Sequence, residues 1–350
     1  MCAEQPAATV PCAAGAAPAP LPAPPADHVL RNRHGLTVSI NPLGATWTRC
    51  LLPLADGPRD ILLGSDDLAT MLAGGSYLGA TIGRYAGRIA HARFGPHHLA
   101  ANQPPHILHG GPGGFSRRLW QVQASGTGAQ HLTLQLHSAD GDQGFPGNLQ
   151  ASACYQLDDD NTLTITYIAH TDAPTPCNLT SHAYFNLDGP TRRDGLGQWL
   201  RLHATHYQPV AADGIPDGAP RPVAGTGFDF RQGKTLGQDL LQDAGQQRVD
   251  GYDHSFLLDN HGQLALAAEL RSADGRVRLR MATNQPALHL YAGRHLAGVP
   301  DRHGQPMAAH AGIALESQHP PDSPSHGRAI LHPGTPYHHV IRLQFDWDRH

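Results

Sequence analysis

The chain has 350 residues, of which 15% are charged, and its formal net charge at pH 7 is -4. Lysine is scarce beside arginine, so we expect no basic face that could hold a nucleic acid and no nucleic-acid partner. No apolar run approaches the roughly 20 residues needed to cross a bilayer, and the amino terminus lacks the pattern of a signal peptide. We therefore expect a cytoplasmic protein without a membrane partner.

The amino-terminal segment is rich in alanine and proline. Residues 1–26 include the run AAGAAPAP at positions 13–20, and such a composition cannot bury enough apolar surface to fold. We predict a disordered tail over residues 1–26. Because no shift of composition divides the rest of the chain, we predict one domain over residues 27–350.

Short alternating segments follow the tail, and they predict β-strands. Apolar residues share one face in residues 149–157 and again in residues 163–167, and the polar turn between them completes a hairpin signature. A second hairpin is predicted where residues 264–268 lead through Asp274-Gly275 to residues 277–281. Further strands are expected at residues 36–40, 132–136 and 340–345, and helical periodicity is found only near residues 66–72 and 236–241. The pattern predicts an all-β fold of packed sheets.

Two glycine-rich segments in the first third of the chain carry candidate binding residues. In residues 79–89, Arg84 and Arg88 each follow a glycine, so their guanidinium groups can approach a ligand over a low backbone. In residues 108–115, His109 precedes a glycine loop that could let its ring turn into a cleft. Solvated arginines and an ordinary loop histidine are the structural alternatives.

Two later segments place polar groups beside apolar strands. In residues 178–187, His182 and Tyr184 share one face if the segment is a strand, and this pairing suits sugar recognition. In residues 249–258, the carboxylate of Asp253 can accept two hydrogen bonds from vicinal hydroxyls. For Asp253 the structural alternative is a turn that precedes a strand.

Glu316 is the most informative single residue. It lies among small and apolar residues just before a proline-rich turn, and no lysine or arginine occurs within ten residues of it. We expect its carboxylate to be shielded from water, a setting that favours a general base. A glutamate at a strand end that faces solvent is the structural alternative.

Cysteine and histidine usage gives little sign of a metal site. The 5 cysteines are widely spaced and form no C-x-x-C pair, so we expect reduced thiols. The 25 histidines cluster locally, but no Asp, Glu or Cys accompanies the clusters at ligand spacing. These clusters are His97-His98, His106 with His109, and His338-His339. We expect neither a metal nor a cofactor.

Five motifs, in chain order, resemble those of the aldose 1-epimerase family, whose members are also called galactose mutarotases. They are Gly-Arg-x-x-Gly-Arg-Ile ending at Ile89, Leu108-His109-Gly110-Gly111, the segment from Ser181 to Leu187, Gly251-Tyr252-Asp253-His254, and Leu315-Glu316-Ser317. The resemblance covers roughly residues 28–347. It implies the galactose mutarotase-like fold, a large antiparallel β-sandwich.

The resemblance also implies roles for particular residues. Glu316 would be the catalytic base and His182 the catalytic acid. The hydroxyls and ring oxygen of a small monosaccharide substrate would be bound by Arg88, His109, Asp253 and Gln285, with Tyr184 lining the same pocket. Gly87 stands where the family usually has asparagine, so a hydrogen bond to a sugar hydroxyl is either missing or supplied by backbone or water.

The implied reaction needs a base and an acid on opposite sides of the sugar. The base takes the proton of the anomeric hydroxyl, the acid protonates the ring oxygen, and the ring opens to the aldehyde. Rotation about the C1–C2 bond and reclosure then give the other anomer. An ionised Glu316 and a protonated His182 fit these roles, and His109 could share the proton-donor task. The reaction needs no metal or cofactor.

The sequence leaves two other functions open. A hexose-6-phosphate 1-epimerase would need several basic groups at the rim of its pocket, and Arg84 and Arg88 alone are few. The sequence does not show whether Arg117, Arg118 and Arg294 also lie near the pocket. A non-catalytic sugar-binding protein on the same fold is the second alternative, although such a protein would not need both Glu316 and His182. The sequence decides neither the preferred sugar nor whether the protein is a monomer or a dimer.

Overall fold

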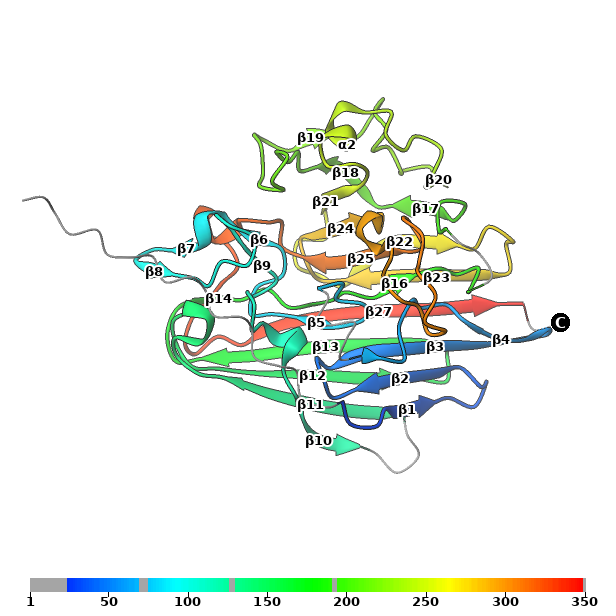
Figure 1. Cartoon of the computed structure of the whole chain (residues 1–350), viewed down its shortest axis with the longest axis horizontal. Coiled ribbons are helices and arrows are strands. Elements are labelled where there is room, and N and C mark those ends of the chain that lie inside the picture. Colours follow the sequence, from blue (N-terminus) through cyan, green and yellow to red (C-terminus); the bar gives the residue numbers. More distant parts are fainter. Residues whose placement is uncertain (1–23, 69–74, 126–129, 191–193, 349–350) are drawn as a thin grey trace, which may run out of the picture.

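Antiparallel β-sheets make up most of the molecule in the computed structural model (Figure 1), which describes residues 24–68, 75–125, 130–190 and 194–348. The largest sheet has nine strands, in the order β10 (Gln121–Ser125), β11 (His131–Ser138), β12 (Leu149–Leu157), β13 (Thr162–Thr171), β27 (Tyr337–Trp347), β23 (Val277–Thr283), β22 (Ala265–Arg271), β17 (Trp199–Leu202) and β20 (Lys234–Thr235). The predicted all-β class is confirmed.

Two further sheets complete the main architecture. The six-stranded sheet has the order β16 (Tyr184–Phe185), β25 (Ile313–Gln318), β24 (Ala287–Tyr291), β21 (Asp253–Leu258), β18 (Ala204–Tyr207) and β19 (Arg221–Pro222). The four-stranded sheet joins β1 (His28–Arg31), β2 (Thr37–Asn41), β3 (Thr46–Leu54) and β4 (Gly57–Asp60) in chain order. Figure 1 shows β21, β24 and β25 above strands β27, β13, β12 and β11 of the nine-stranded sheet in this view.

Small ribbons and short helices occupy the connections. The two-stranded ribbons are β14 (Thr175–Pro176) with β26 (Ile330–Leu331), β15 (Thr180–Ser181) with β5 (Thr81–Ile82), β6 (Arg88–Ile89) with β9 (Ile107–Leu108), and β7 (Arg93–Phe94) with β8 (His97–His98). Among the described residues the helices are α2 (Ala244–Arg248) and the 3₁₀ turns η1 (Ala90–Ala92), η2 (Phe115–Arg117), η3 (Asp142–Gly144), η4 (Arg294–Leu296) and η5 (Ser323–His326). No helix among the described residues is long and apolar enough to cross a membrane.

Both predicted hairpins form. Strands β12 and β13 pair from Leu149 with Thr171 to Leu157 with Leu163, and β22 pairs with β23 from Ala265 with Thr283 to Arg271 with Arg278. The predicted strands at residues 36–40, 132–136 and 340–345 correspond to β2, β11 and β27. The predicted helix at residues 236–241 is wrong, because this segment forms hydrogen-bonded turns and the helix α2 begins only at Ala244. Most of the segment 66–72 and of the tail 1–26 lies outside the described residues.

The hydrophobic core takes side chains from all three large sheets. Strand β12 shows why: its odd-numbered residues are buried and its even-numbered residues are more exposed, because side chains alternate between the two faces of a strand. Trp47 of β3 joins the three sheets, since its ring packs edge-on against Phe185 of β16 and Phe345 of β27. The distances between ring centroids are 5.9 Å and 6.5 Å. Replacing so large a buried ring by alanine typically costs about 3–5 kcal/mol.

All six residues of strand β25 are buried, so both of its faces are covered. Ile313 and Leu315 enter the main core, whereas the alternate residues Ala314, Glu316 and Gln318 face the other way. The register of the six-stranded sheet places His289 opposite Glu316 and Ser255 opposite His289. Polar side chains of three neighbouring strands are thereby gathered on one face of the sheet.

Candidate active site

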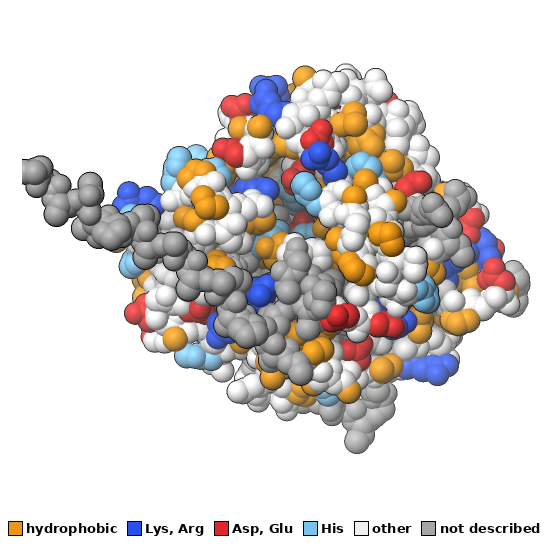
Figure 2. All heavy atoms as spheres, viewed as in Figure 1, with side chains coloured by type: hydrophobic (Ala, Val, Ile, Leu, Met, Phe, Trp, Pro, Cys, Tyr) orange, Lys and Arg blue, Asp and Glu red, His pale blue; other side chains and the backbone are white. Residues whose placement is uncertain are grey.

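A cavity of about 400 Å³ opens over this face of the six-stranded sheet. In Figure 2, histidine and acidic side chains are visible at the bottom of a hollow near the centre of the face shown. The lining residues that concern the chemistry are Tyr77, Gly87, Arg88, Gln103, His109, His182, Tyr184, Asp253, His289, Tyr291, Glu316 and Gln318. The cavity therefore collects side chains from segments that are far apart in the sequence.

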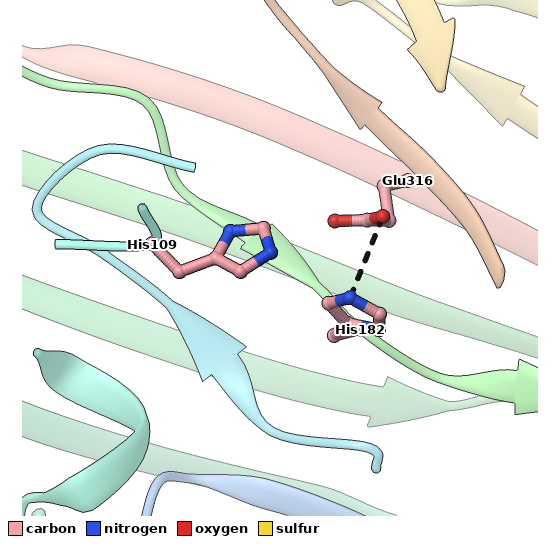
Figure 3. Close-up of side chains that lie close together, drawn as sticks. All are labelled: His109, His182 and Glu316. Carbon is pink, nitrogen blue, oxygen red and sulfur yellow. Dashed lines mark ion pairs between the residues drawn. The ribbon is translucent and has the colours of Figure 1, made fainter. Parts of the chain in front are cut away.

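Glu316 and His182 form the closest acid and base pair in the cavity. Nε2 of His182 lies 3.6 Å from Oε1 of Glu316 (Figure 3), and the two residues are only 4% and 2% exposed. Strand β25 supplies the glutamate, and the link between β15 and β16 supplies the histidine. Among the described residues, neither Oε2 of Glu316 nor Nδ1 of His182 has a hydrogen-bond partner. Buried polar atoms are nearly always paired, so these two mark a place where a polar ligand would be bound.

Aromatic rings fix the orientation of the His182 ring. The ring of Tyr184 stacks on the imidazole with a centroid distance of 4.8 Å and an interplanar angle of 30°. The ring of Tyr77 also stacks on it, with a centroid distance of 5.8 Å and an angle of 23°. His182 and Tyr184 thus lie on the same side, as the alternation of a strand predicts. The stacked rings limit the rotation of the imidazole, whose Nε2 lies on the side of Glu316.

His109 is held in place by the backbone of Gly87. The N–H of Gly87 donates to Nδ1 of His109 at 3.1 Å, so the proton of the neutral ring is on Nε2, the nitrogen that faces His182 and Glu316 (Figure 3). Burial, together with the electrostatic effect of the neighbouring His182 and Arg88, holds the pKa of His109 well below its usual range. His109 is therefore a neutral hydrogen-bond donor whose ring does not swing with the glycine loop.

The same hydrogen bond bears on metal binding. One ligand atom from each of His109, His182 and Glu316 lies within 4.8 Å of the others, which is close enough to hold a metal ion. A metal on Nε2 of His109 would displace the proton to Nδ1, where it would oppose the N–H of Gly87. The donor set therefore fits a hydrogen-bonded ligand better than a metal ion.

Asp253 and His289 form a second buried pair. Nε2 of His289 donates to Oδ1 of Asp253 at 2.7 Å, and Nδ1 of His289 lies 3.0 Å from Oγ of Ser255. Burial alone would raise the pKa of Asp253, but the hydrogen bond and charge of His289 hold this pKa below its ordinary value. Burial would likewise lower the pKa of His289, but the Asp253 carboxylate raises it. The pair therefore keeps a carboxylate ionised beneath the cavity.

Arg88 and Gly87 lie beside each other at the rim. Nε of Arg88 donates to Oε1 of Gln103 at 3.1 Å, and its guanidinium lines the cavity. Gly87 has φ = +82°, and a Cβ built on it would approach no atom outside its neighbours closer than 3.7 Å. The backbone here adopts a left-handed conformation that glycine and asparagine accept more readily than other residues.

Eight residues were expected to form the site, and seven of them contribute to the wall of the cavity. The seven are Gly87, Arg88, His109, His182, Tyr184, Asp253 and Glu316. Gln285 is absent from the lining; it precedes β24, and the residue of that strand that lines the middle of the cavity wall is His289. We therefore do not retain Gln285 as a ligand. Its buried Oε1 has no hydrogen-bond partner among the described residues.

The interpretation of Arg84 as a ligand-facing arginine needs correction. Arg84 is 1% exposed, and its guanidinium donates to Oγ of Ser138, Oγ1 of Thr175 and the carbonyls of Ser138, Ala139 and Pro146 at 2.8–3.2 Å. Five donors satisfied inside the protein leave none for a ligand. The preceding glycine, which suggested access, instead lets Arg84 enter the interior.

Sequence reasoning missed His289, Gln318 and Tyr77. A signal for His289 was present, since Leu288 and Leu290 alternate with it and predict that a histidine faces away from the core. Gln318 follows Glu316 by two residues on the same strand, so it shares the face of the glutamate. Tyr77 lies in a loop with φ = +57°, and no pattern in the sequence places it against His182.

Comparison with known proteins identifies one family. The family model that matches the chain is described as aldose 1-epimerase and spans residues 27–344. The aldose 1-epimerase of Escherichia coli strain K12 is 42% identical over 327 residues, which are 90% of this chain and 94% of that protein. The galactose mutarotase of Mus musculus is 37% identical, and the match covers 89% of this chain and 91% of that protein.

Among solved structures, an aldose epimerase homologue from C. elegans has a TM-score of 0.84 at 29% identity, covering 93% of this chain and 100% of that one. A galactose 1-epimerase from Lactobacillus acidophilus has a TM-score of 0.77 at 32% identity, with 92% and 94% covered.

Proposed function

Because the chain belongs to the aldose 1-epimerase family and is an isomerase with that activity, we propose that it interconverts the α and β anomers of free hexoses, galactose and glucose among them. The observation that carries the proposal is the buried pair of Glu316 and His182, whose nearest N and O atoms are 3.6 Å apart. In this proposal Glu316 is the catalytic base and His182 the catalytic acid. Because a gap of 3.6 Å leaves no room for a sugar between them, they act from the same side, on the two oxygens bonded to C1, and the expected placement on opposite sides of the sugar is wrong. Galactose is the substrate named for several relatives, which supports testing it first.

The reaction proceeds by transfer of two protons. Glu316 takes the proton of the anomeric hydroxyl while His182 gives a proton to the ring oxygen, and the C1–O5 bond opens to the aldehyde. Rotation about C1–C2 presents the other carbonyl face. On reclosure His182 recovers a proton from the C5 hydroxyl and Glu316 returns one to the new anomeric oxygen, so both groups end as they began. A carboxylate and an imidazole kept out of water suffice for these steps.

The other cavity residues bind the neutral sugar in this proposal. His109 donates from Nε2, Asp253 accepts from hydroxyls through the oxygen that His289 does not hold, and Arg88 donates from its guanidinium. Tyr184 offers an apolar ring face beside the pocket. The unpaired carbonyl oxygen of Gln318 adds an acceptor that a hydroxyl can satisfy.

The charges of the cavity favour a free sugar over a phosphorylated one. Arg88 is the one arginine or lysine among the described lining residues, and the carboxylates of Asp253 and Glu316 share the cavity with it. Of the other arginines, Arg84 is buried elsewhere, and Arg118 and Arg294 are paired with Asp142 and Asp250. A phosphate dianion is usually held by several basic groups. These observations favour free hexoses over hexose 6-phosphates.

A non-catalytic sugar-binding role is the less favoured alternative. A protein that only binds sugar gains nothing from burying a carboxylate against an imidazole, since burial of both groups costs solvation. For the compartment we propose the cytoplasm. Cys50, Cys154 and Cys177 are free thiols, and reduced cysteines are typical of that compartment.

Polarimetry of freshly dissolved α-D-galactose and α-D-glucose tests the proposal. We expect the wild type to accelerate the approach to anomeric equilibrium, and Glu316→Gln to lower kcat by at least about 100-fold, within the range contributed by a general base. Glu316→Gln is expected to bind galactose with little loss in a ligand-observed NMR titration. The matched control is Glu269→Gln, because Glu269 lies on β22 outside the cavity, paired with Arg271 and Arg278.

The outcomes separate the parts of this proposal. Acceleration by the wild type and by Glu269→Gln but not by Glu316→Gln supports both the reaction and the base. Near-normal turnover by Glu316→Gln would refute its assignment as the base. No acceleration of either sugar by the wild type, with acceleration of galactose 6-phosphate, would favour the phosphosugar alternative.

A further inference from the structure

A tight turn behind the cavity wall lies against Arg88. Residues 211–215, in the connection between β18 and β19, form this turn, in which the N–H of Ala211 donates to the carbonyl of Ile215 at 2.8 Å and the N–H of Gly214 donates to the carbonyl of Ala211 at 2.9 Å. None of these five residues lines the cavity. The turn therefore meets Arg88 outside the cavity.

Gly214 makes the closest approach to the guanidinium. It is buried and has φ = +77°, and a Cβ built on it would lie 2.5 Å from Nη1 and 2.7 Å from Cζ of Arg88. Real Cβ atoms do not come so close to other heavy atoms, so a methyl group here would have to displace the flexible end of Arg88. The bare backbone of Gly214 thus forms a flat support for the guanidinium.

Two polar contacts fix this arrangement. His106 accepts the N–H of His91 at Nδ1, 3.0 Å away, so its Nε2 carries a proton and donates to Oδ2 of Asp213 at 3.2 Å. The other oxygen of Asp213 accepts the N–H of Ile215 at 3.1 Å. Asp213 therefore ties the turn to the loop that carries Gln103, the partner of Nε of Arg88. The guanidinium therefore contacts both Gln103 and Gly214.

We propose that the turn 211–215 is a positioning element for the sugar-binding Arg88, with Gly214 as its support and the contact between Asp213 and His106 as its anchor. This inference rests on the proposed function, because it takes Arg88 to be a ligand of the sugar. An arginine has many rotamers, and a side chain held in one of them loses less freedom when it binds. The turn therefore contributes to sugar affinity without touching the sugar.

The test compares two glycines of the same connection. Gly214 and Gly218 have nearly the same backbone, with φ = +77° and +84°, but nothing lies within 4 Å of a Cβ on Gly218. Gly214→Ala and Gly218→Ala therefore carry a similar backbone penalty, and only the first displaces Arg88. We expect Gly214→Ala to raise KM for galactose roughly tenfold, the lower end of what a hydrogen bond to a charged group contributes, with kcat changed less than about twofold. Gly218→Ala is expected to match the wild type in both parameters.

A double mutant shows whether Gly214 acts through Arg88. In the Arg88→Ala background the guanidinium is gone, so adding Gly214→Ala is expected to change KM no further, because effects that pass through one group are not additive. Asp213→Asn, which places an amide donor opposite Nε2–H of His106, is expected to raise KM in the same direction as Gly214→Ala. If Gly214→Ala instead acted through a general structural change, it would raise KM by the same factor in the Arg88→Ala background as in the wild type.

The outcomes keep this inference separate from the proposed function. If the wild type turns sugar over and Gly214→Ala has the KM of Gly218→Ala, the positioning inference is overturned while the proposed function stands. If the wild type does not accelerate mutarotation, the proposed function fails, and a ligand-observed NMR titration with galactose on the same proteins still decides the inference through their Kd values. Equal Kd values, or no sugar binding by the wild type, would overturn it.

Discussion

We expect acid to destabilise this protein strongly, because three histidines are held as neutral imidazoles, two of them fully buried (His254 and His339) and one partly buried (His319). Burial lowers the pKa of His339 to about 3, against a smaller opposite effect of the Leu179 carbonyl. Burial also lowers the pKa of His254 to about 4 and that of His319 to about 4. His339 matters most for the site, since its Nδ1 donates to the Leu179 carbonyl at 2.9 Å and its Nε2 accepts from Ser317 at 2.7 Å. These two hydrogen bonds connect the segment that leads to His182 with the strand that carries Glu316.

The direction and the size of this loss of stability follow from the linkage between folding and proton binding. A histidine whose pKa is lower in the folded state binds fewer protons there than in the unfolded chain, so stability is lost as the pH falls below the unfolded value of about 6.5. Between pH 7.5 and pH 5.0 a histidine with a folded pKa of about 3 or 4 loses about 2 kcal/mol. The three together lose about 6 kcal/mol, a large part of the stability of an ordinary domain. His289 acts in the opposite direction, because its raised pKa adds stability that is lost only as the pH rises through its folded value.

Urea unfolding at a series of pH values measures this effect, with His339→Asn as the variant. At pH 7.5 we expect the variant to be less stable by about 1 kcal/mol, because Ser317 loses its acceptor. Between pH 7.5 and pH 5.0 it is expected to lose about 2 kcal/mol less than the wild type. The control is His338→Asn, since His338 is the exposed neighbour on the same strand and is expected to leave the pH dependence unchanged. If His339→Asn and the wild type lose the same free energy on acidification, His339 is not a buried neutral group.

Two further predictions concern the cavity. Gly87→Asn restores the side chain usual in the family at a position where a Cβ meets nothing closer than 3.7 Å, and we expect it to lower KM for galactose about 2- to 10-fold through one added hydrogen bond. Gly87→Ala adds the Cβ without the amide and is expected not to lower KM, so equal KM values in the two variants would contradict the reasoning. His289→Gln keeps a donor for Asp253 and is expected to change KM less than about threefold, whereas His289→Ala leaves the buried carboxylate unpaired and is expected to lower the free energy of unfolding by about 3 kcal/mol. Polarimetry and urea unfolding measure these effects, and identical behaviour of the two His289 variants would show that the contact with Asp253 is unimportant.

Alternation along single strands made much of the fold predictable from the sequence. The pattern of residues 149–157 and 163–167 predicted a hairpin, which the structure confirms, because a buried face and a short turn favour pairing of the two strands. The order of strands in the sheets was beyond this reasoning. Strand β25 pairs with β24 and β16, and the second pairing depends on contacts between residues that are far apart in the chain.

The site was predictable in its motifs and not in its contacts. A pattern of glycines before Arg84 and Arg88 suggested the same role for both, yet Arg84 is enclosed by carbonyls of residues 138–146 while Arg88 lines the cavity. The difference comes from tertiary partners, which local sequence does not specify. The same is true of His289, whose partner Asp253 lies on a neighbouring strand, and of Gly214, which lies against Arg88 from a distant turn.

The hydrogen bonds of the three cavity histidines argue for one of them as the proton carrier. His109 is fixed as a donor by the N–H of Gly87, and His289 is held at both nitrogens by Asp253 and Ser255. Neither ring can exchange a proton with a ligand without breaking a buried hydrogen bond. His182 differs, because its Nδ1 has no partner among the described residues and its Nε2 lies 3.6 Å from the carboxylate of Glu316. A group that must give up and recover a proton in every cycle needs such freedom, which supports His182 as the catalytic acid.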